Sequence, residues 1–590
     1  MIDQPAGPAN DDAPKPVKLS PVEKIKVESR YLRGTIAEEL VDGTDAFSKS
    51  SEALLKHHGT YMQDDRDQRS VSKDRSLIMM IRSRIPGGRM TSDQLMAEID
   101  LGDQLGNGTV RLTTRQVIQH HGVPKGSLRE LIRRVNEIGL STLAACGDVN
   151  RNVMCCPAPY VNPIYRQLHE VTDRLVAHLA PRTKAYHEIW LSDPVAGEKE
   201  LVGGATEDDV VEPIYGKTYL PRKFKSAIGL PFDNCVDIYT NDLGFLAIIR
   251  DGVIVGFNVL VGGGMGMTPA NKKTYPALAK RMAFCTVEQV CAVAEAVVKV
   301  QRDHGNRADR KQARMKYLVD KVGIDRFRAM VQDYYGASLP DCEPDDVTGH
   351  DDHIGWFEQG DGKLFYGLNI ENGRVYDGQD KRIKQALREI CGEFGFPIRL
   401  TAHQSLIFAD IDPSQRDRVM AILDRHGVQR SEKYSQVRRW SMACVAWPTC
   451  GLAITESERA LPGVMDEFEP MLESLGLQDE QFTVRMTGCP NGCARPYNAD
   501  IGIVGKAKDR YTVYLGGGRL GKRLAFVYKD MVSRETLIAE LRAVFELFRD
   551  GRQAGESFGD FCARQGRDAL LIATGSEIPV ETAAAAEGEE

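Results

Sequence analysis

The apolar and polar positions along the chain alternate between short strand-like runs and longer helical segments. Apolar residues recur at helical spacing over residues 127–138, 287–302 and 534–549. This spacing predicts amphipathic helices, and the short apolar runs between them predict strands. The alternation of the two kinds of segment indicates an α+β fold with mixed sheets.

Two strand-like motifs recur in the same order, about half a chain apart. Residues 110–118 (VRLTTRQVI) are similar to residues 398–407 (IRLTAHQSLI), and residues 257–266 (FNVLVGGGMG) to residues 511–521 (YTVYLGGGRLG). Such a pattern indicates a duplicated half rather than a solenoid of short repeats. It divides the chain into a first repeat over residues 75–330, a linker over residues 331–354 and a second repeat over residues 355–573.

The two ends of the chain and one internal stretch differ in composition from these repeats. Residues 1–20 and the acidic residues 574–590 have few apolar groups to bury, which predicts disordered tails. Residues 193–212 are rich in Gly, Asp and Glu and predict a surface insertion.

Residues 21–74 form an N-terminal extension, for which we predict contact with a partner protein. Charged and aliphatic residues alternate at helical spacing from Pro21 to Leu40, and Ser20 is a plausible cap for this helix. Residues 57–67 are polar and predict a loop.

The glycine triplets at residues 262–264 and 516–518 allow two interpretations. Backbone N–H groups of such turns can bind a phosphate. Neither copy matches a Walker loop or a dinucleotide fingerprint, so a turn at the end of a strand that needs positive φ is at least as well supported.

Composition and charge limit the classes of function. A net charge of −7 gives no basic footprint for nucleic acid, so an anionic substrate requires a local basic site. Thirteen cysteines without a regular framework are typical of a reducing compartment. The N-terminus has no targeting pattern, and no stretch is long and apolar enough to span a membrane. We therefore expect a cytoplasmic protein with no membrane partner.

Four cysteines form the strongest chemical motif. Cys444 and Cys450 lie in CVAWPTC, and Cys489 and Cys493 lie in CPNGC. If the chain folds back between the two motifs, the four thiolates can bind one metal centre. Structural zinc sites usually have cysteine pairs at closer spacing than Cys-x5-Cys, and a [4Fe-4S] cluster requires four thiolates. Buried free thiols are the remaining alternative.

The pattern Cys-x5-Cys followed by TGCPNGC resembles the sulfite and nitrite reductases that carry siroheme beside a [4Fe-4S] cluster. The resemblance extends from about residue 20 to about residue 566 and implies two pseudo-two-fold halves with the cofactors between them. It also implies that all four cysteines bind the cluster and that Cys493 bridges an iron of the cluster to the siroheme iron. A non-catalytic iron–sulfur or zinc protein is the alternative from another class.

Basic residues form the second informative set. Lys223 and Lys225 share one side of the chain if their segment is extended, although any single cation is more often a solvated surface residue. The resemblance implies that one group surrounds the distal face of the siroheme: Arg82, Arg151, Lys223 and Lys225. It places a second group nearer the siroheme and its carboxylates: Arg111, Arg115 and His121. Adjacent cations should lower the pKa values of the two lysines, which suits general acids.

The resemblance implies the six-electron reduction of sulfite to sulfide, in sulfate assimilation and cysteine biosynthesis. Nitrite reductases of the family tend to have Asn at the position of Lys225, so we predict sulfite as the substrate. The chain has no flavin or nicotinamide fingerprint, and residues 19–67 resemble the branch that receives electrons from an NADPH-dependent flavoprotein. A ferredoxin is the alternative donor. We expect removal of residues 1–60 to weaken coupling to the flavoprotein and to preserve turnover with a chemical reductant.

Overall fold

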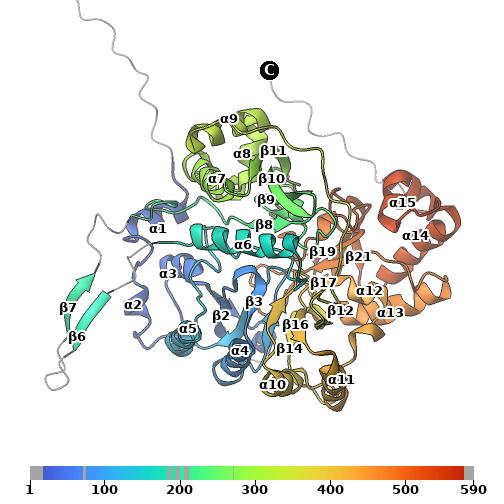
Figure 1. The fold of residues 1–590 in the computed structure, drawn as a ribbon, viewed down its shortest axis with the longest axis horizontal. Coiled ribbons are helices and arrows are strands. Elements are labelled where there is room, and N and C mark those ends of the chain that lie inside the picture. Colours follow the sequence, from blue (N-terminus) through green and yellow to red (C-terminus); the bar gives the residue numbers. More distant parts are fainter. Residues whose placement is uncertain are drawn as a thin grey trace, which may run out of the picture.

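The computed structural model describes residues 18–70, 75–182, 188–192, 199–204, 211–269 and 271–576. Figure 1 shows three lobes: a lower lobe in blue and gold, an upper lobe in green and a right-hand lobe in orange and red. Three large hydrophobic cores correspond to these lobes. Most of the predicted tails, apart from residues 18–20 and 574–576, and most of the predicted insertion at residues 193–212 lie outside the described residues.

The lower lobe contains two five-stranded sheets, and each includes one strand from the other half of the chain. Their strand orders are β1-β2-β5-β4-β14 and β12-β13-β16-β15-β3. β14 (Arg374–Val375) pairs with β4 (Val110–Leu112), and β3 (Arg89–Met90) pairs with β15 (Ile398–Leu400). This reciprocal exchange joins both halves in one hydrophobic core. The other strands are β1 (Thr60–Asp64), β2 (Leu77–Ser83), β5 (Ile118–Val123), β12 (Gly355–Glu358), β13 (Leu364–Leu368) and β16 (Leu406–Ile411).

Several long helices contribute side chains to the same core. They are α4 (Ser92–Leu105), α5 (Leu128–Glu137), α10 (Ile383–Phe394) and α11 (Arg416–Arg425). The first of them begins with a capping box, in which the Thr91 hydroxyl accepts from the Gln94 N–H and the Gln94 amide accepts from the Thr91 N–H. The predicted helix at residues 127–138 is confirmed as α5.

The upper and right-hand lobes repeat one arrangement. In the upper sheet β8 (Ser226–Gly229) is parallel to β9 (Leu243–Arg250), and in the right-hand sheet β18 (Val484–Thr487) is parallel to β19 (Ile501–Ala507). The predicted duplicated α+β fold with mixed sheets is confirmed. The remaining strands of these lobes are β10 (Val253–Val261), β11 (Lys280–Thr286), β17 (Ser441–Ala443), β20 (Arg510–Leu515) and β21 (Phe526–Ser533). A separate two-stranded sheet consists of β6 (Glu188–Ser192) and β7 (Lys199–Gly204).

Helices complete these two lobes. α7 (Val290–His304) and α14 (Leu537–Gly551) confirm the helices predicted at residues 287–302 and 534–549, each starting about three residues later. The other helices are α6 (Pro163–His178), α8 (Met315–Val322), α9 (Ile324–Tyr335), α12 (Gln436–Arg439), α13 (Leu461–Ser474), α15 (Phe558–Gln565) and α16 (Arg567–Ala573).

The glycine triplets are strand-end turns. Gly262 and Gly516 have φ values of +88° and +84°, which disfavour any residue with a Cβ. A Cβ at Gly263 would lie 2.3 Å from the carbonyl oxygen of Tyr239, and one at Gly517 would lie 2.1 Å from that of Ala499. Close approach of two backbone segments therefore explains both triplets.

The N-terminal extension differs from the prediction in two places. Ser20 caps α1 (Pro21–Glu28) as expected, but the helix does not continue to Leu40, because residues 30–32 have positive φ. They are followed by the short α2 (Ile36–Glu39) and by α3 (Lys49–Leu55). The predicted loop at residues 57–67 is also wrong, since its centre is the edge strand β1, paired with β2. The strand is only partly buried, so its residues are mostly polar and lack the apolar alternation that predicts a strand.

The extension is an integral part of the first half. The Lys26 ammonium is fully buried, where it donates to the Leu220 carbonyl at 2.8 Å and lies 3.5 Å from the Asp148 carboxylate. Removing one member of a buried ion pair costs about 3–5 kcal/mol. Leu32 and Leu54 also belong to the core of the upper lobe. This packing contradicts the expectation that residues 1–60 can be removed without harm to turnover.

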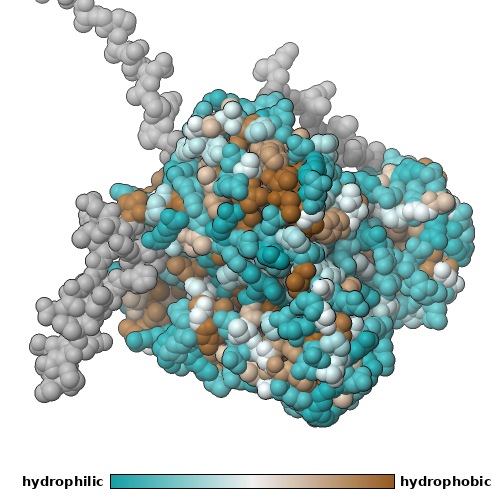
Figure 2. Space-filling view, in the orientation of Figure 1, coloured by the Kyte–Doolittle hydropathy of each residue, from teal (hydrophilic) through white to brown (hydrophobic). Residues whose placement is uncertain are grey.

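The face of the molecule drawn in Figure 2 is mostly hydrophilic. Figure 2 shows apolar side chains gathered over the region of β10 and β11, with hydrophilic side chains around them. Among the described residues, no helix has the length and apolar character needed to cross a membrane.

Candidate active site and cluster centre

Two parallel strands bring the cysteine motifs together. Cys444 follows β17, Cys489 comes shortly after β18, and the two strands are adjacent and parallel, so their carboxyl ends share one edge of the sheet. The Cys444 N–H donates to the Met486 carbonyl at 3.2 Å, and the Gly488 N–H donates to the Cys444 Sγ at 3.4 Å. Pairing of two neighbouring strands therefore places motifs that are distant in sequence side by side.

The four predicted cluster cysteines act on one another electrostatically. Burial raises the pKa of Cys489 to about 12, and Cys493 and Cys450 add to this effect. Burial likewise raises the pKa of Cys444, with contributions from the other three thiols. All four are free of disulfides. Crowded thiols with raised pKa values keep their protons unless cations compensate the thiolate charge, and the irons of a [4Fe-4S] cluster supply that compensation. The donor set therefore fits the cluster.

Arg66 holds the first cysteine motif in place. Its guanidinium donates to three backbone carbonyls, those of Pro448 at 2.8 Å, Cys450 at 2.6 Å and Ala453 at 2.9 Å. The same group lies over the Trp447 ring, 3.8 Å from its centroid. Through Arg66, the segment after β1 supports the cluster loop directly.

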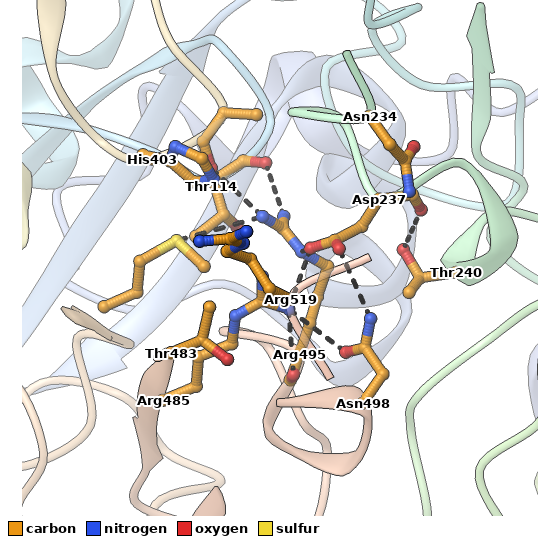
Figure 3. Close-up of polar contacts among 12 residues, drawn as sticks. Thr114, Asn234, Asp237, Thr240, His403, Thr483, Arg485, Arg495, Asn498 and Arg519 are labelled. Carbon is orange, nitrogen blue, oxygen red and sulfur yellow. Dashed lines mark hydrogen bonds and ion pairs between the residues drawn. The ribbon is translucent and has the colours of Figure 1, made fainter. Parts of the chain in front are cut away.

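Arg495 holds the second cysteine motif. This side chain lies two residues after Cys493 and reaches both halves of the molecule (Figure 3). Its Nε is 2.5 Å from the Asp237 carboxylate, and its terminal nitrogens donate to the carbonyls of Thr114 at 3.1 Å and Ala402 at 3.2 Å. Thr114 and Ala402 occupy equivalent positions in the repeated motifs, so one guanidinium joins the same turn from each repeat.

Asp237 is the counterpart of Arg495 in the other half. Each residue has a left-handed backbone, with φ of 48° and 58°, and each caps a short 3-10 helix. Arg485 also reaches Asp237, at 2.8 Å. The buried ion pair between Asp237 and Arg495 therefore lies where the equivalent turns of the two halves meet.

A dense group of cations lies beside Cys493. Burial lowers the pKa of Lys223 to about 7, and Arg222, Arg314 and Arg151 lower it further. Burial also lowers the pKa of Lys225, followed by the effect of Lys223, and Cys493 opposes the shift at both lysines. The direction predicted for the two lysines is thus confirmed. Among the described residues, neither ammonium has a hydrogen bond or an ion pair.

Arg115 and Arg151 lie in this group as well. Arg115 donates to Asn241 Oδ1 at 2.9 Å and to the Ser226 carbonyl at 2.7 Å. Burial lowers its pKa to about 9, and Arg151 is the next contributor. Arg115, which the resemblance assigns to the second predicted group, thus also lies close to the lysines, since its charge lowers the pKa of Lys225.

That second group contains Arg111 and His121. Arg111 Nε lies 2.7 Å from Glu458, and its Nη2 donates to the Ala443 carbonyl at 2.8 Å. Burial lowers the pKa of His121 well below its ordinary value, and Arg374, Arg111 and Arg82 add to the effect, so the imidazole is neutral. Arg82 also donates to Cys146 Sγ at 2.9 Å. The charge of Arg82 also opposes the rise in the pKa of Tyr61 that burial causes. The Tyr61 hydroxyl accepts a hydrogen bond from Arg151 at 3.5 Å.

Several buried polar atoms around these residues have no partner in the described chain. They are Nε of Arg115, Nε of Arg151 and both ring nitrogens of His121. Unsatisfied buried polar groups are rare in native proteins and indicate a missing partner. A macrocycle with many carboxylates, together with a small oxyanion, supplies acceptors for the two guanidinium N–H groups and for the single N–H of the neutral His121 ring. The residues therefore fit a siroheme and an anionic substrate.

Several residues that shape the site carried no recognised local signal in the sequence. They are Tyr61, Arg66, Asp237, Arg314, Glu458 and Arg495. Arg314, for example, lies far along the chain from the lysines, yet it pairs with Asp242 through Nε at 3.0 Å and Nη2 at 2.8 Å. Asp242 Oδ2 in turn accepts from the Lys225 N–H at 2.9 Å. A longer comparison of the repeats would have aligned DIYTNDLG with RPYNADIG and drawn attention to Asp237 and Arg495.

The fold and the site define a redox protein in which a four-cysteine centre adjoins a cationic site between two related halves. The chain belongs to the nitrite and sulfite reductase family. The family's "Nitrite and sulphite reductase 4Fe-4S domain" matches residues 170–339 and 434–580, and its "Nitrite/Sulfite reductase ferredoxin-like half domain" matches residues 71–138 and 357–426.

Curated relatives and a solved structure agree with this assignment. The chain is 44% identical to the sulfite reductase [NADPH] hemoprotein beta-component of Chromohalobacter salexigens, over 94% of this chain and 97% of the relative. It is 43% identical to the protein of the same name from Bacillus subtilis, over 93% and 95%. The structure of the NirA protein of Mycobacterium tuberculosis superimposes with a TM-score of 0.76 at 26% identity, covering 94% of this chain and 98% of that one.

These findings confirm the main predictions from the sequence. The chain is an enzyme of the sulfite reductase type, and its cofactors are siroheme and a [4Fe-4S] cluster. The non-catalytic alternative is wrong. The individual roles of the site residues and the boundaries of the segments stay predictions.

Proposed function

We propose that this chain is the hemoprotein component of a cytoplasmic, NADPH-dependent sulfite reductase that supplies sulfide for cysteine biosynthesis. The observation that carries the proposal is the pair of ammonium groups of Lys223 and Lys225 beside Cys493, for which the described part of the chain provides no hydrogen-bond or ion-pair partner. A small dianion neutralises two such charges, and its oxygens accept their hydrogen bonds. The names of the curated relatives support the same substrate and the same reductant.

The cofactors have ligands in this chain. The cluster would be held by Cys444, Cys450, Cys489 and Cys493, with Cys493 shared with the siroheme. The siroheme carboxylates would be bound by the donors of Arg111, Arg115 and His121. When bound, the siroheme and the cluster supply the electrons and the iron at which sulfite is reduced.

The two lysines are placed to deliver protons. Reduction of sulfite to sulfide releases three oxygen atoms as water, so acids must act repeatedly at the same place. A Lys223 ammonium with a pKa of about 7 is partly protonated at neutral pH, and it both releases and regains a proton easily. Arg82 and Arg151 keep their charge and hold the anion in position while the lysines titrate.

Lys225 favours sulfite over nitrite. Sulfite carries up to two negative charges and nitrite carries one, so a second ammonium beside Lys223 stabilises sulfite more. Arg115 and Arg314 add further positive charge near this position, as their effect on the pKa of Lys225 indicates. This added charge also favours sulfite over nitrite.

Electrons must reach the cluster from another protein, since the chain has no flavin or nicotinamide fingerprint. We propose an NADPH-oxidising flavoprotein as this partner, contacted through residues 21–74. The contact of Arg66 with the loop of Cys450 supports the assignment, because it places this segment against the cluster. A ferredoxin is the alternative donor.

Anaerobic turnover of the purified holoenzyme tests the proposal. Rates are measured with sulfite and with nitrite, using NADPH plus the flavoprotein, reduced ferredoxin or reduced methyl viologen as the donor. We expect a higher kcat/KM for sulfite than for nitrite with every active donor, and NADPH plus the flavoprotein to support turnover. Preference for nitrite would overturn the substrate assignment. Turnover with ferredoxin but not with the flavoprotein would overturn the assignment of the flavoprotein as the electron donor.

A further inference from the structure

A second group of potential metal ligands lies apart from the cluster cysteines. It consists of Cys156, Asp233, Cys235 and His353, whose ligand atoms all lie within 4.8 Å of one another. Their side chains are at most 3% exposed. Neither the cysteine motifs nor the cationic site uses them.

The four residues come from three separate segments. Cys156 lies between α5 and α6, Asp233 and Cys235 follow β8, and His353 immediately precedes β12. The first two segments belong to the first half of the chain. His353 belongs to the predicted linker before the second half. A bond between these groups would attach the linker to the first half.

The polar atoms converge on one point. Cys156 Sγ lies 2.8 Å from Asp233 Oδ2 and 3.2 Å from His353 Nε2, and the latter two atoms are 3.0 Å apart. Thiol and carboxylate thus both face the same ring nitrogen. In a catalytic Cys-His-Asp arrangement they would contact opposite nitrogens of the ring. Convergence and burial therefore favour metal ligation over nucleophilic catalysis.

The backbone orients the carboxylate and the imidazole. Asp233 Oδ1 accepts from the N–H groups of Cys235 at 3.2 Å and Asp351 at 3.3 Å, which leaves Oδ2 directed at the centre of the group. His353 has φ of +56°, and its N–H donates to Asp351 Oδ1 at 3.0 Å. Such secondary contacts orient ligands in metal sites, and a non-glycine residue in the left-handed region indicates a constrained position.

We propose that Cys156, Asp233, Cys235 and His353 form a structural zinc site that fastens the linker to the first half. Two sulfurs, one nitrogen and one carboxylate oxygen are a typical tetrahedral ligand set for Zn²⁺. Bonds of about 2.0 Å to nitrogen and about 2.3 Å to sulfur separate those two ligands by about 3.5 Å. The three observed distances are shorter than those of a loaded site: 3.2 Å between Cys156 Sγ and His353 Nε2, and 2.8 Å and 3.0 Å from these atoms to Asp233 Oδ2. Zinc binding therefore requires an outward shift of the ligands, which is largest for the Asp233 carboxylate. The proposal does not depend on the function proposed above.

Metal analysis of the holoenzyme tests this site. The protein is purified without metal-affinity steps or chelators from cultures supplied with zinc, and zinc and iron are measured in the same sample by mass spectrometry. We expect about one zinc per chain in addition to the iron of the cofactors. Zinc K-edge absorption should show two sulfur ligands and two nitrogen or oxygen ligands.

Three variants distinguish this site from adventitious zinc. Asp233→Asn and Cys235→Ser should each lower the zinc content by at least about tenfold, with the siroheme absorbance retained. Cys285→Ser is the matched control, because Cys285 is a fully buried thiol in the same hydrophobic core, and it should keep its zinc. Wild-type protein with complete cofactors but without zinc, or with another metal in the site, would overturn the proposal. So would zinc that is equally retained in Asp233→Asn and Cys235→Ser.

Discussion

Replacement of Asp237 by Asn tests whether the ion pair between the halves holds the site together. The carboxylate is fully buried, 2.8 Å from Arg485 Nη1 and 2.5 Å from Arg495 Nε. Asparagine keeps the size of the side chain but removes its charge. Two buried guanidinium groups then share a neutral partner, and one of them, Arg495, carries the loop of Cys493.

The expected loss of stability in Asp237→Asn depends on the hydrogen bonds that each guanidinium retains. Breaking a buried ion pair by removing one partner costs about 3–5 kcal/mol. Arg495 keeps its bonds to the carbonyls of Thr114 and Ala402, and Arg485 keeps Asn498 Oδ1 at 3.1 Å. We therefore expect the lower end, about 3 kcal/mol, which corresponds to unfolding on the order of 10²-fold faster if the loss appears entirely in the rate.

The pH dependence gives the same interaction an independent signature. Burial alone would raise the pKa of Asp237, but Arg485 and Arg495 outweigh it and hold the pKa below its ordinary value. A depressed carboxyl pKa contributes stability above the unfolded value of about 4, and this contribution is lost as the pH falls through the folded pKa. The difference between wild type and Asp237→Asn should therefore shrink below about pH 4.

The assay measures the rates at which siroheme absorbance and tryptophan fluorescence are lost in urea. Rates are used because a chain with several lobes has no single unfolding equilibrium. Asp341→Asn is the control: it removes a surface pair with Arg328 in which Asp341 is 90% exposed, and it should change the rate by less than about fivefold. If Asp237→Asn unfolds no faster than this control, the ion pair does not stabilise the contact between the halves.

Three further variants test individual residues of the site. Lys225→Asn should lower kcat/KM for sulfite about 10- to 100-fold, as expected for one charge-assisted hydrogen bond, and should lower it less for nitrite; an unchanged ratio would refute the role of Lys225. The pKa of Lys223 is lowered to about 7, so its charge is lost as the pH rises. We therefore expect kcat/KM for sulfite to fall above pH 7. Lys223→Arg should move that fall to higher pH, and an unmoved profile would assign it to another group. Arg66→Ala removes three hydrogen bonds to the loop of Cys450 and should accelerate loss of cluster absorbance at least tenfold, about 1.4 kcal/mol. Arg69→Ala, which removes a more exposed arginine of the same segment, should not.

The features that could be predicted from the sequence are those with a local signature. The motifs around Cys444 and Cys489 are short and contain all four predicted ligands of the cluster, so one pass along the chain identifies them. Lys223 and Lys225 were accessible because alternation in an extended segment places both on one side and because the family resemblance implies that this segment lines the substrate site. The duplication was recognisable because two motifs recur in the same order.

The features that were missed depend on pairing between distant segments. β3 and β14 have two residues each, too few for any periodicity, yet they connect the halves. β1 is a polar edge strand whose identity depends on its pairing with β2. The group around His353 comes from three segments, so thiols that look scattered in the sequence meet only in the folded chain.

The duplicated halves divide the chemistry unequally, and the pairs of equivalent residues show how. The Lys225 N–H donates to Asp242 Oδ2 at 2.9 Å, and the Thr483 N–H donates to Asp500 Oδ2 at the same distance, so the backbone of both copies is held in one way. The side chains differ: the first copy has the Lys225 ammonium, for which we propose contact with the substrate, and the second has the Thr483 hydroxyl, which donates to Asp500 Oδ2 at 2.7 Å.

Asp237 and Arg495 are a second pair of equivalent residues whose side chains differ, here by having opposite charges. In a symmetric dimer of identical halves, two equal charges would face each other at this position and repel. Duplication within one chain allowed the two copies to differ, and the pair became attractive. The half with Asp237 contains the cations proposed to bind the substrate, and the half with Arg495 contains the predicted cluster cysteines. The ion pair between Asp237 and Arg495 joins these two parts of the site.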